Sequence, residues 1–226
     1  MKKYTDAILF ALLFVFFTLL TRVIDVQVVG PQDAWVGFAR MNVAVHEFFG
    51  MNLLWYKLTQ ILGLAAIAVA GVFAVTGAVQ LIKRKSLLKV DREVLMLGVV
   101  YIIVIILYVL FEKFAVNYRP VILDAAEGLE PSYPSTHTML ILTVFGTAIR
   151  ACGYYIKNTK LLVCARVFAL LVMALTIVGR LVCGVHWLTD IIGGILISIS
   201  LIYLYRGLTT AKTAQAELQE NTNEKQ

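Results

Sequence analysis

Six long apolar stretches, separated by short polar segments, make up most of this chain. They span about residues 4–24, 58–82, 94–111, 138–156, 161–179 and 187–205. A helix needs about 20 mostly apolar residues to cross the hydrocarbon core of a bilayer, and every stretch comes near that length. The pattern therefore predicts an all-α polytopic membrane protein with about six transmembrane helices. We expect residues 1–208 to form one six-span domain, and residues 209–226 to form a polar cytoplasmic tail.

The first connection, residues 25–57, is long and mixes aromatic with polar side chains. Its aromatic residues include Trp35, Phe38, Phe48, Phe49 and Trp55. Aromatic side chains favour the headgroup level of a bilayer, and an amphipathic helix can lie in that plane. Residues 34–49 are therefore predicted either as an interfacial helix or as a loop that repacks over the helix ends.

Composition and charge support the membrane assignment and argue against a nucleic-acid partner. Hydrophobic residues make up 60% of the chain, against about 45–50% in soluble domains. The net charge of +6 comes from basic residues scattered over short loops, which is typical of topology determinants. The three cysteines lie in or near apolar stretches at no metal-like spacing, and they indicate no disulfide framework.

The distribution of Lys and Arg over the connections predicts which face is cytoplasmic. Fourteen of the 20 Lys and Arg residues fall on the side that carries both termini and the connections after the second and fourth stretches. The other six fall on the opposite side. Because cytoplasmic loops are enriched in basic residues, we expect a multi-pass plasma-membrane protein with both termini in the cytoplasm.

Ionisable residues inside the apolar pattern mark candidate chemistry, because each one is costly at membrane depth. One group lies in the run Arg180-Leu-Val-Cys-Gly-Val-His186-Trp-Leu-Thr-Asp190. The i, i+4 spacing of His186 and Asp190 puts both side chains on one helical face. A carboxylate there fixes the imidazole tautomer and leaves the other ring nitrogen as a nucleophile or base. A structural polar contact between helices is the alternative.

A second group lies upstream and has features typical of a phosphate site. Arg119 precedes a proline, and residues 133–137 read Tyr-Pro-Ser-Thr-His ahead of an apolar helix. Guanidinium groups bind phosphate oxygens in bidentate geometry, and helix N-termini bind anions. Arginines on lipid headgroups and an ordinary helix cap are the simpler alternatives. Under the predicted topology Arg119, His137, Arg180 and His186 come from three separate segments, yet all reach the outer face.

Three elements in this order on a six-span chain resemble the type 2 phosphatidic acid phosphatase (PAP2) superfamily: Arg119-Pro120, Pro134-Ser135-x-His137 and Arg180-x5-His186-x3-Asp190. The resemblance covers about the second half of the chain. It implies the helical core of a superfamily that also includes vanadium haloperoxidases and bacterial acid phosphatases. Within that superfamily, the span count and the outer-facing site resemble the integral lipid phosphatases.

The resemblance implies a role for each matching residue. His186 would be the nucleophile that forms a phosphohistidine, Asp190 would orient it, and His137 would protonate the leaving group. No metal ion and no other cofactor is implied. The phosphate of the substrate would be bound by Arg119, Arg180, Ser135, Thr136 and Lys113.

Three positions depart from the family pattern. The first element normally reads Lys-x6-Arg-Pro, but Glu112 stands at the lysine position and Lys113 follows it, about 100° further round a helix. Either an unwound helix end lets Lys113 reach the phosphate, or the lysine function is absent. Thr136 replaces a usual glycine, and Gly179 replaces a usual serine before Arg180 and so removes one hydroxyl donor.

We therefore expect a metal-independent membrane phosphatase that acts on a lipid phosphomonoester or pyrophosphate at the extracytoplasmic face. The candidate substrates are undecaprenyl pyrophosphate, phosphatidylglycerol phosphate and phosphatidic acid. An isoprenoid pyrophosphate is slightly favoured, because an outer-facing site suits the recycling of a carrier lipid. Two alternatives remain: a phosphotransferase that uses the same site, and a non-catalytic lipid-phosphate-binding or transport protein with a degenerate site. Membrane lipids are expected partners, and no sequence feature indicates an oligomeric state.

Overall fold

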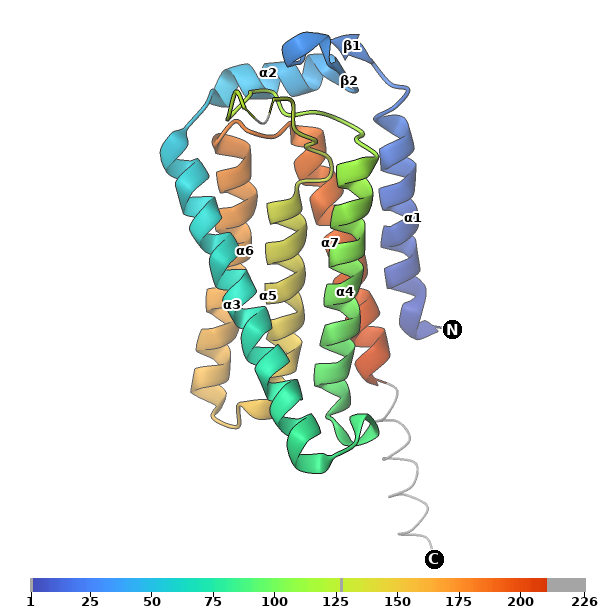
Figure 1. Cartoon of the computed structure of the whole chain (residues 1–226), viewed down its shortest axis with the longest axis vertical. Coiled ribbons are helices and arrows are strands. Elements are labelled where there is room, and N and C mark those ends of the chain that lie inside the picture. Colours follow the sequence, from blue (N-terminus) through green and yellow to red (C-terminus); the bar gives the residue numbers. More distant parts are fainter. Residues whose placement is uncertain (1, 127, 211–226) are drawn as a thin grey trace, which may run out of the picture.

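The computed structural model describes residues 2–126 and 128–210, and helices dominate this part of the chain (Figure 1). Its α-helices are α1 (Thr5–Leu20), α2 (Ala39–Phe49), α3 (Leu53–Arg84), α4 (Arg92–Lys113), α5 (Thr136–Tyr155), α6 (Thr159–Val182) and α7 (Leu188–Thr210). Two short strands, β1 (Gln27–Val28) and β2 (Trp35–Val36), form an antiparallel hairpin in which Gln27 pairs with Val36. Short 3-10 helices cover Lys2–Tyr4, Pro31–Asp33 and Leu87–Lys89.

Apolar helices form an upright bundle, which confirms the predicted all-α polytopic fold (Figure 1). Among the described residues, α3, α4, α5, α6 and α7 are long and apolar enough to cross a membrane. The sixth apolar helix, α1, has 16 residues and packs along α7. The first predicted span, residues 4–24, is too long at its C-terminal end, because the helix stops at Leu20 and the chain then turns.

The two helices at the centre of the bundle, α5 and α7, are the least hydrophobic of the five long ones. In each of them 56% of an 18-residue segment is buried, against 11–22% in α3, α4 and α6. Small residues on α7 let neighbouring segments approach closely, and a Cβ at Gly193 would lie 2.7 Å from the Tyr133 ring. The strongly apolar α3, α4 and α6 then present their side chains outward, where lipid is the favourable surrounding.

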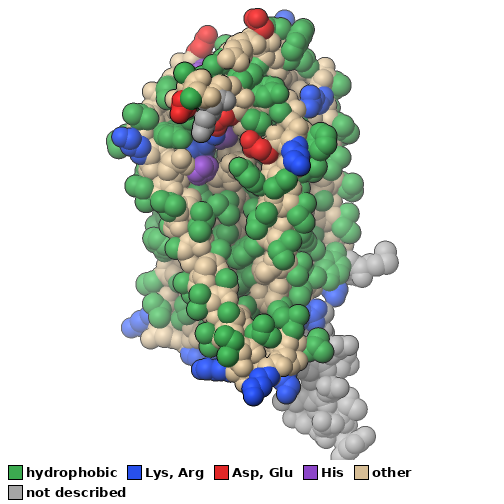
Figure 2. Space-filling view, in the orientation of Figure 1, with side chains coloured by type: hydrophobic (Ala, Val, Ile, Leu, Met, Phe, Trp, Pro, Cys, Tyr) green, Lys and Arg blue, Asp and Glu red, His purple; other side chains and the backbone are tan. Residues whose placement is uncertain are grey.

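One end of the bundle is covered by α2, the β-hairpin and the segment 114–135, of which residues 114–126 and 128–135 are described (Figure 1). The first connection therefore does contain a helix, but it begins at Ala39, and the preceding residues form β2 and a left-handed turn at Phe38. Trp35 and Phe48 are 63% and 81% exposed in this layer. Lys and Arg gather at the opposite end of the bundle, with a hydrophobic belt between the two ends (Figure 2).

Several helix boundaries differ from the predicted spans, and for α3 a side-chain cap explains the difference. α3 starts five residues before the predicted span because the Asn52 side chain accepts hydrogen bonds from two amides of the first turn, at 3.1 and 3.2 Å. α6 continues past the predicted end at residue 179, so Arg180 lies in its last turn. α7 continues to Thr210, two residues into the predicted tail. The remainder of that tail, residues 211–226, lies outside the described residues.

Candidate active site

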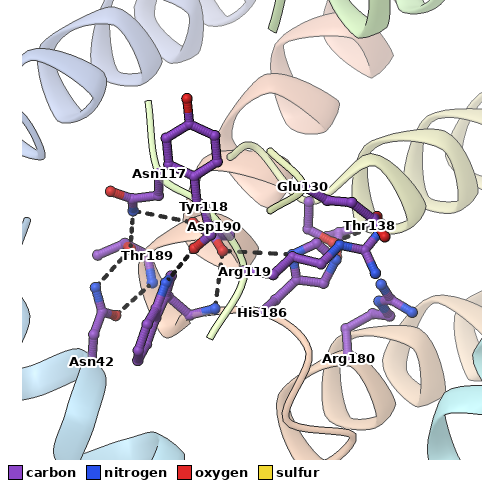
Figure 3. A network of polar contacts seen from close by, with 12 residues as sticks. Asn42, Asn117, Tyr118, Arg119, Glu130, Thr138, Arg180, His186, Thr189 and Asp190 are labelled. Atoms are coloured by element: carbon purple, nitrogen blue, oxygen red, sulfur yellow. Dashed lines mark hydrogen bonds and ion pairs between the residues drawn. The ribbon is translucent and has the colours of Figure 1, made fainter. Parts of the chain in front are cut away.

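Most of the polar residues that the sequence marked gather below the layer of α2 and the segment 114–135, at the ends of α5, α6 and α7 (Figure 3). Arg180, Asp190 and Ser135 are fully buried, and His186 is 4% exposed. Burial of polar and charged groups at the end of an apolar bundle is costly unless each group has a partner. The partners of each side chain therefore indicate what the group is built to bind.

Asp190 and His186 meet across the start of α7. The helix begins at Leu188, so His186 lies in the preceding turn. The prediction from the i, i+4 spacing, that the two side chains share a helical face, is therefore wrong. Instead the Asp190 carboxylate reaches back: its Oδ2 accepts a hydrogen bond from the Trp187 amide (2.9 Å) and lies 3.5 Å from His186 Nδ1. This is the reach-back of a capping box. Catalytic contacts in unliganded sites are often long and shorten when substrate binds.

A sharp turn between α6 and α7 places His186. Gly184 in this turn has a φ of 70°, and a Cβ on it would overlap the carbonyl group of Gly50. Glycine adopts this left-handed conformation without the steric cost that other residues pay. The position of His186, two residues later, therefore depends on a residue without a side chain.

His186 is held in its neutral form. Burial, and then the positive charges of Arg180 and Arg119, lower the pKa of His186 well below the ordinary value of 6.5. Asp190 Oδ2 lies 3.5 Å from Nδ1, and the Ser132 backbone also interacts with the imidazole. Within the described residues, neither ring nitrogen makes a hydrogen bond of regular geometry. A neutral imidazole whose second nitrogen is not shared has the form that nucleophilic catalysis requires.

Arg180 is a buried cation whose guanidinium has more N–H donors than the neighbouring side chains use. Its Nη1 donates to Thr59 Oγ1 on α3 (3.2 Å), and its guanidinium carbon lies 5.9 Å from the centre of the Tyr56 ring. Its Nε and Nη2 are buried and have no hydrogen-bond partner within the described part of the chain. One hydroxyl and one ring offset only part of the desolvation of a charge. The geometry suits an anion that accepts two N–H bonds at once.

Arg119 comes from the segment between α4 and α5, which folds back on itself. The Arg119 amide donates to the Glu130 carbonyl (3.0 Å), and the Ser132 amide donates to the Asn117 carbonyl (2.9 Å). The guanidinium of Arg119 forms an ion pair with Glu130 (Nη2 to Oε2, 2.7 Å), and its buried Nε has no hydrogen-bond partner in the residues described. Arg119 thus holds a carboxylate and keeps one donor for a second anion.

The N-terminus of α5 completes the group. Ser135 is its N-cap residue, and Ser135 Oγ accepts hydrogen bonds from the Thr138 amide (3.4 Å) and the Thr138 hydroxyl (3.0 Å). The Ser135 amide donates to the Asp190 carbonyl (2.9 Å), which ties the start of α5 to the start of α7. Thr136 and His137 follow in the first turn, where the amides have no partner within the helix and favour an anion.

Lys113 does not belong to this buried group. α4 is helical through Lys113, so the unwound helix end considered above is not found in the described α4. Both Lys113 and Glu112 are exposed. Contact between Lys113 and a phosphate stays a prediction.

The departure at Gly179 has a packing explanation. A Cβ on Gly179 would lie 2.7 Å from Thr59 Cγ2 and 3.1 Å from the Trp55 ring. Contacts this short force a neighbour to shift, because protein interiors are close-packed. The missing side chain therefore lets α3 approach α6 closely enough for the Thr59 hydroxyl to reach Arg180, so α3 supplies a hydroxyl beside this arginine.

Four buried polar residues that contact the site residues were not predicted from the sequence. They are Asn42, Thr59, Asn117 and Thr189. The nearness of Asn117 to Arg119 in the sequence was a weak signal. Thr59 gave none, because a threonine in an apolar helix can bond to its own backbone, as Thr59 also does to the Tyr56 carbonyl (2.9 Å).

A lateral cavity of about 400 Å³ opens between α3, α4 and α5, beside the site. His137 and Thr136 line its polar end, and apolar side chains such as Leu64 and Ile105 line the rest. Gly63 on α3 makes room for the imidazole, because a Cβ there would lie 3.1 Å from His137 Cδ2. The cavity therefore connects a candidate catalytic side chain with the hydrophobic belt of the bundle.

Comparisons with known proteins gave one family match and one structural match. A model of the PAP2 superfamily matches residues 93–214, more than half of the chain. The fold is similar to the crystal structure of a transmembrane PAP2-type phosphatidylglycerolphosphate phosphatase from Bacillus subtilis, with a TM-score of 0.62 and 16% sequence identity. That similarity covers 89% of this chain and 94% of the other. No curated protein matches the sequence.

Proposed function

This chain belongs to the PAP2 superfamily, and we propose that it is an integral membrane phosphatase that hydrolyses a lipid phosphomonoester or pyrophosphate through a phosphohistidine. The observation that carries the proposal is the fully buried guanidinium of Arg180, which has two donors without a partner among the described residues. A buried cation is strongly favoured by an anionic partner. A phosphoryl group fits, because its oxygens match the guanidinium fork and Arg119 offers a further donor.

In the first step His186 Nε2 attacks the phosphorus atom. An N–P bond forms, the P–O bond to the leaving group breaks, and His137 gives a proton to the departing oxygen. Asp190, beside Nδ1, stabilises the positive charge that the imidazole acquires. Arg119 and Arg180 hold the equatorial oxygens of the phosphoryl group, where most of the catalysis is electrostatic.

In the second step water attacks the phosphohistidine and loses a proton to His137. The N–P bond breaks, inorganic phosphate leaves, and His186 returns to its neutral form. The Ser135 hydroxyl assists as a donor, since its oxygen accepts two hydrogen bonds and its own hydrogen is left for a phosphate oxygen. The Thr136 amide adds a second donor at the α5 N-terminus. One water is consumed for each phosphate released, and neither step uses a metal ion.

The lateral cavity supports a lipid as the substrate. Its polar end holds His137, and its apolar part lies between α3 and α4 in the hydrophobic belt. A lipid chain in the cavity would place the attached phosphate beside the catalytic side chains. Undecaprenyl pyrophosphate, phosphatidylglycerol phosphate and phosphatidic acid all combine a chain with a phosphate in this way, and they are the substrates that we propose to compare.

The distribution of charge supports an extracytoplasmic site. Lys and Arg gather at the end of the bundle opposite the candidate site (Figure 2), and cytoplasmic ends of membrane helices are enriched in these residues. We infer that both termini lie in the cytoplasm and that the site opens toward the outer leaflet of the plasma membrane.

Phosphate release by the purified protein tests the proposal. The three lipids would be compared in detergent, with EDTA present and without added metal. We expect release that vanadate inhibits, that EDTA leaves unchanged and that His186→Ala abolishes, with His186→Ala still folded. Transfer of phosphate to an added alcohol in place of water would favour the phosphotransferase. No release by a folded preparation, with binding of the lipids retained, would favour the non-catalytic binding protein and would make Glu112 the residue to explain.

A further inference from the structure

A chain of buried polar contacts reaches the candidate active site from its outer side. It runs from Asn42 on α2 to Thr189 in the first turn of α7, then to Asn117, and ends on Asp190 (Figure 3). All four residues are fully buried. The mechanism above uses only Asp190, so the burial of the other three residues and the contacts between them need a separate explanation.

Asn117 contacts the half of the Asp190 carboxylate that His186 does not. Asn117 Nδ2 donates to Asp190 Oδ1 (3.2 Å) and to Thr189 Oγ1 (3.3 Å), whereas Asp190 Oδ2 lies beside His186 Nδ1. Together with the Trp187 amide on Oδ2, this gives each carboxylate oxygen a donor, and the Ser132 side chain also interacts with the carboxylate. Donors on both oxygens fix the rotation of the carboxylate plane, and therefore the direction from which it contacts the imidazole.

Asn42 in turn fixes the position of Thr189. Its Nδ2 donates to Thr189 Oγ1 (2.9 Å) and to the Gly37 carbonyl (2.8 Å), and its Oδ1 accepts a hydrogen bond from the Thr189 amide (3.2 Å). The Asn42 amide therefore caps the start of α7 from a different helix. Because every polar atom of this side chain is used, the position of α2 and the start of α7 are coupled.

We propose that Asn117 is a positioning residue for the Asp190–His186 pair, and that Asn42 secures the arrangement from α2. The proposal rests on the proposed function. It assigns a role to α2, which precedes the family match at residues 93–214. Asn117 does not act on the phosphate itself. It keeps Asp190 in the orientation that selects one imidazole tautomer and directs His186 Nε2 toward phosphorus.

Two substitutions of similar size separate this role from simple packing. Asn117→Leu removes both donors, and Asn117→Asp replaces them with acceptors that repel Asp190. We expect kcat for lipid phosphate hydrolysis to fall about 10- to 100-fold. This is the range found when the partner that orients a metal-binding histidine is removed, and Asn117 would orient His186 in a comparable way through Asp190. KM should change less than about threefold, because Asn117 contacts Asp190 and not the substrate. Asn42→Ala should lower kcat less than either variant.

A control variant measures the effect of losing any buried hydrogen bond. Ser200 is also on α7 and donates to the Ala7 carbonyl on α1 (2.8 Å) while 6% exposed. Ser200→Ala should lower the thermal stability slightly and leave kcat unchanged. If Asn117→Leu lowers kcat no more than Ser200→Ala does, Asn117 is a structural residue and the proposal is wrong.

Vanadate binding keeps the test independent of turnover. Vanadate adopts the geometry of the phosphoryl-transfer intermediate and should raise the unfolding temperature of the parent protein in detergent, by a shift that His186→Ala removes. We expect Asn117→Asp and Asn117→Leu to need at least about tenfold more vanadate for the same shift. An unchanged vanadate response overturns the positioning role. If the parent protein binds vanadate but hydrolyses no lipid, while the Asn117 variants lose this binding, the positioning role stands and the proposed hydrolysis is wrong. Where a leucine variant does not fold, Asn117→Asp and Asn42→Ala decide between these outcomes.

Discussion

Arg180→Met tests whether the buried arginine serves a ligand or the fold. Methionine resembles the aliphatic part of arginine in length and flexibility, and it removes the charge. Within the described part of the chain, this charge has one side-chain hydrogen bond, to Thr59 at 3.2 Å, and one aromatic contact, to Tyr56 at 5.9 Å. If the site is built for an anion, the variant should keep its stability and lose its activity.

The contacts of Arg180 set the size of the expected change. Desolvation of a buried ion costs several kcal/mol even after relaxation. The bond to Thr59 returns about 1.5–3 kcal/mol, and the contact with Tyr56 returns at most about 2 kcal/mol. These contacts offset only part of the desolvation cost, so Arg180→Met should raise the free energy of unfolding by about 0 to 2 kcal/mol. Activity should fall at least about 10³-fold, because the loss of one oxyanion donor alone costs about 10²–10³.

Thermal unfolding in detergent, with and without vanadate, measures both parts of this prediction. Vanadate at about 100 times its Kd should stabilise the parent protein by about 2.7 kcal/mol, and this stabilisation should vanish in Arg180→Met. Arg166→Met is the matched control, because Arg166 is exposed near the other end of the same helix. It should leave activity and the vanadate response intact. A loss of 3 kcal/mol or more in Arg180→Met without vanadate, about the cost of breaking a buried ion pair, would refute the reasoning and make Arg180 a structural residue.

Three further predictions concern pH, the lateral cavity and Lys113. His186 must be neutral to attack, and its pKa is lowered below 6.5 by burial, Arg180 and Arg119, so the acid side of the kcat/KM profile should fall only below pH 6.5. The alkaline side reports the loss of the proton that His137 donates, and an acid-side fall centred above pH 6.5, after correction for ionisation of the substrate, contradicts the prediction. Leu64→Trp places a larger side chain in the lateral cavity and should raise KM for long-chain lipid phosphates about tenfold, while KM for a water-soluble short-chain substrate stays unchanged. Leu170→Trp, on the outward face of α6, is the control and should change neither KM. Lys113 is exposed in a regular helical turn, so Lys113→Ala should change kcat/KM less than about threefold; a loss of several orders of magnitude would show that Lys113 binds the phosphate of the substrate.

The apolar pattern predicted the bundle well because length and hydrophobicity are local properties. The span positions followed from runs of apolar residues, and the motif residues that reached one face did so because each stands near the end of a span. The errors lie at helix ends whose position depends on capping side chains. Asn52 starts α3 early, and α7 starts at Leu188, so the helical-face argument for His186 and Asp190 failed although the two side chains do meet. Their contact depends on the reach-back of Asp190 to the Trp187 amide.

The supporting contacts could not be predicted because they join segments far apart in the sequence. Thr59 and Arg180 are separated by 121 positions, and Asn42 and Thr189 by 147. In the sequence, Thr59 is a small polar residue in an apolar run, and such a residue needs no partner outside its own helix. Asn42 lies in a segment for which a helix and a loop were equally compatible with the pattern. Only the packing of α2 and α3 against the later helices gives these residues a role.

The first half of the chain therefore shapes the environment in which the family residues act. Residues 93–214 contain the candidate nucleophile, acid and arginines, but α3 provides the hydroxyl of Thr59 beside Arg180 and the gap at Gly63 beside His137. Without α3, the guanidinium of Arg180 would lose its hydrogen bond to Thr59 and its contact with Tyr56, and a buried charge without partners is strongly disfavoured. With α3 in place, the charge is partly stabilised, and two of its donors have no partner in residues 2–126 and 128–210. A site of this kind is stable enough to persist, yet it still gains from an anion, which is the condition for binding a phosphate strongly in the transition state.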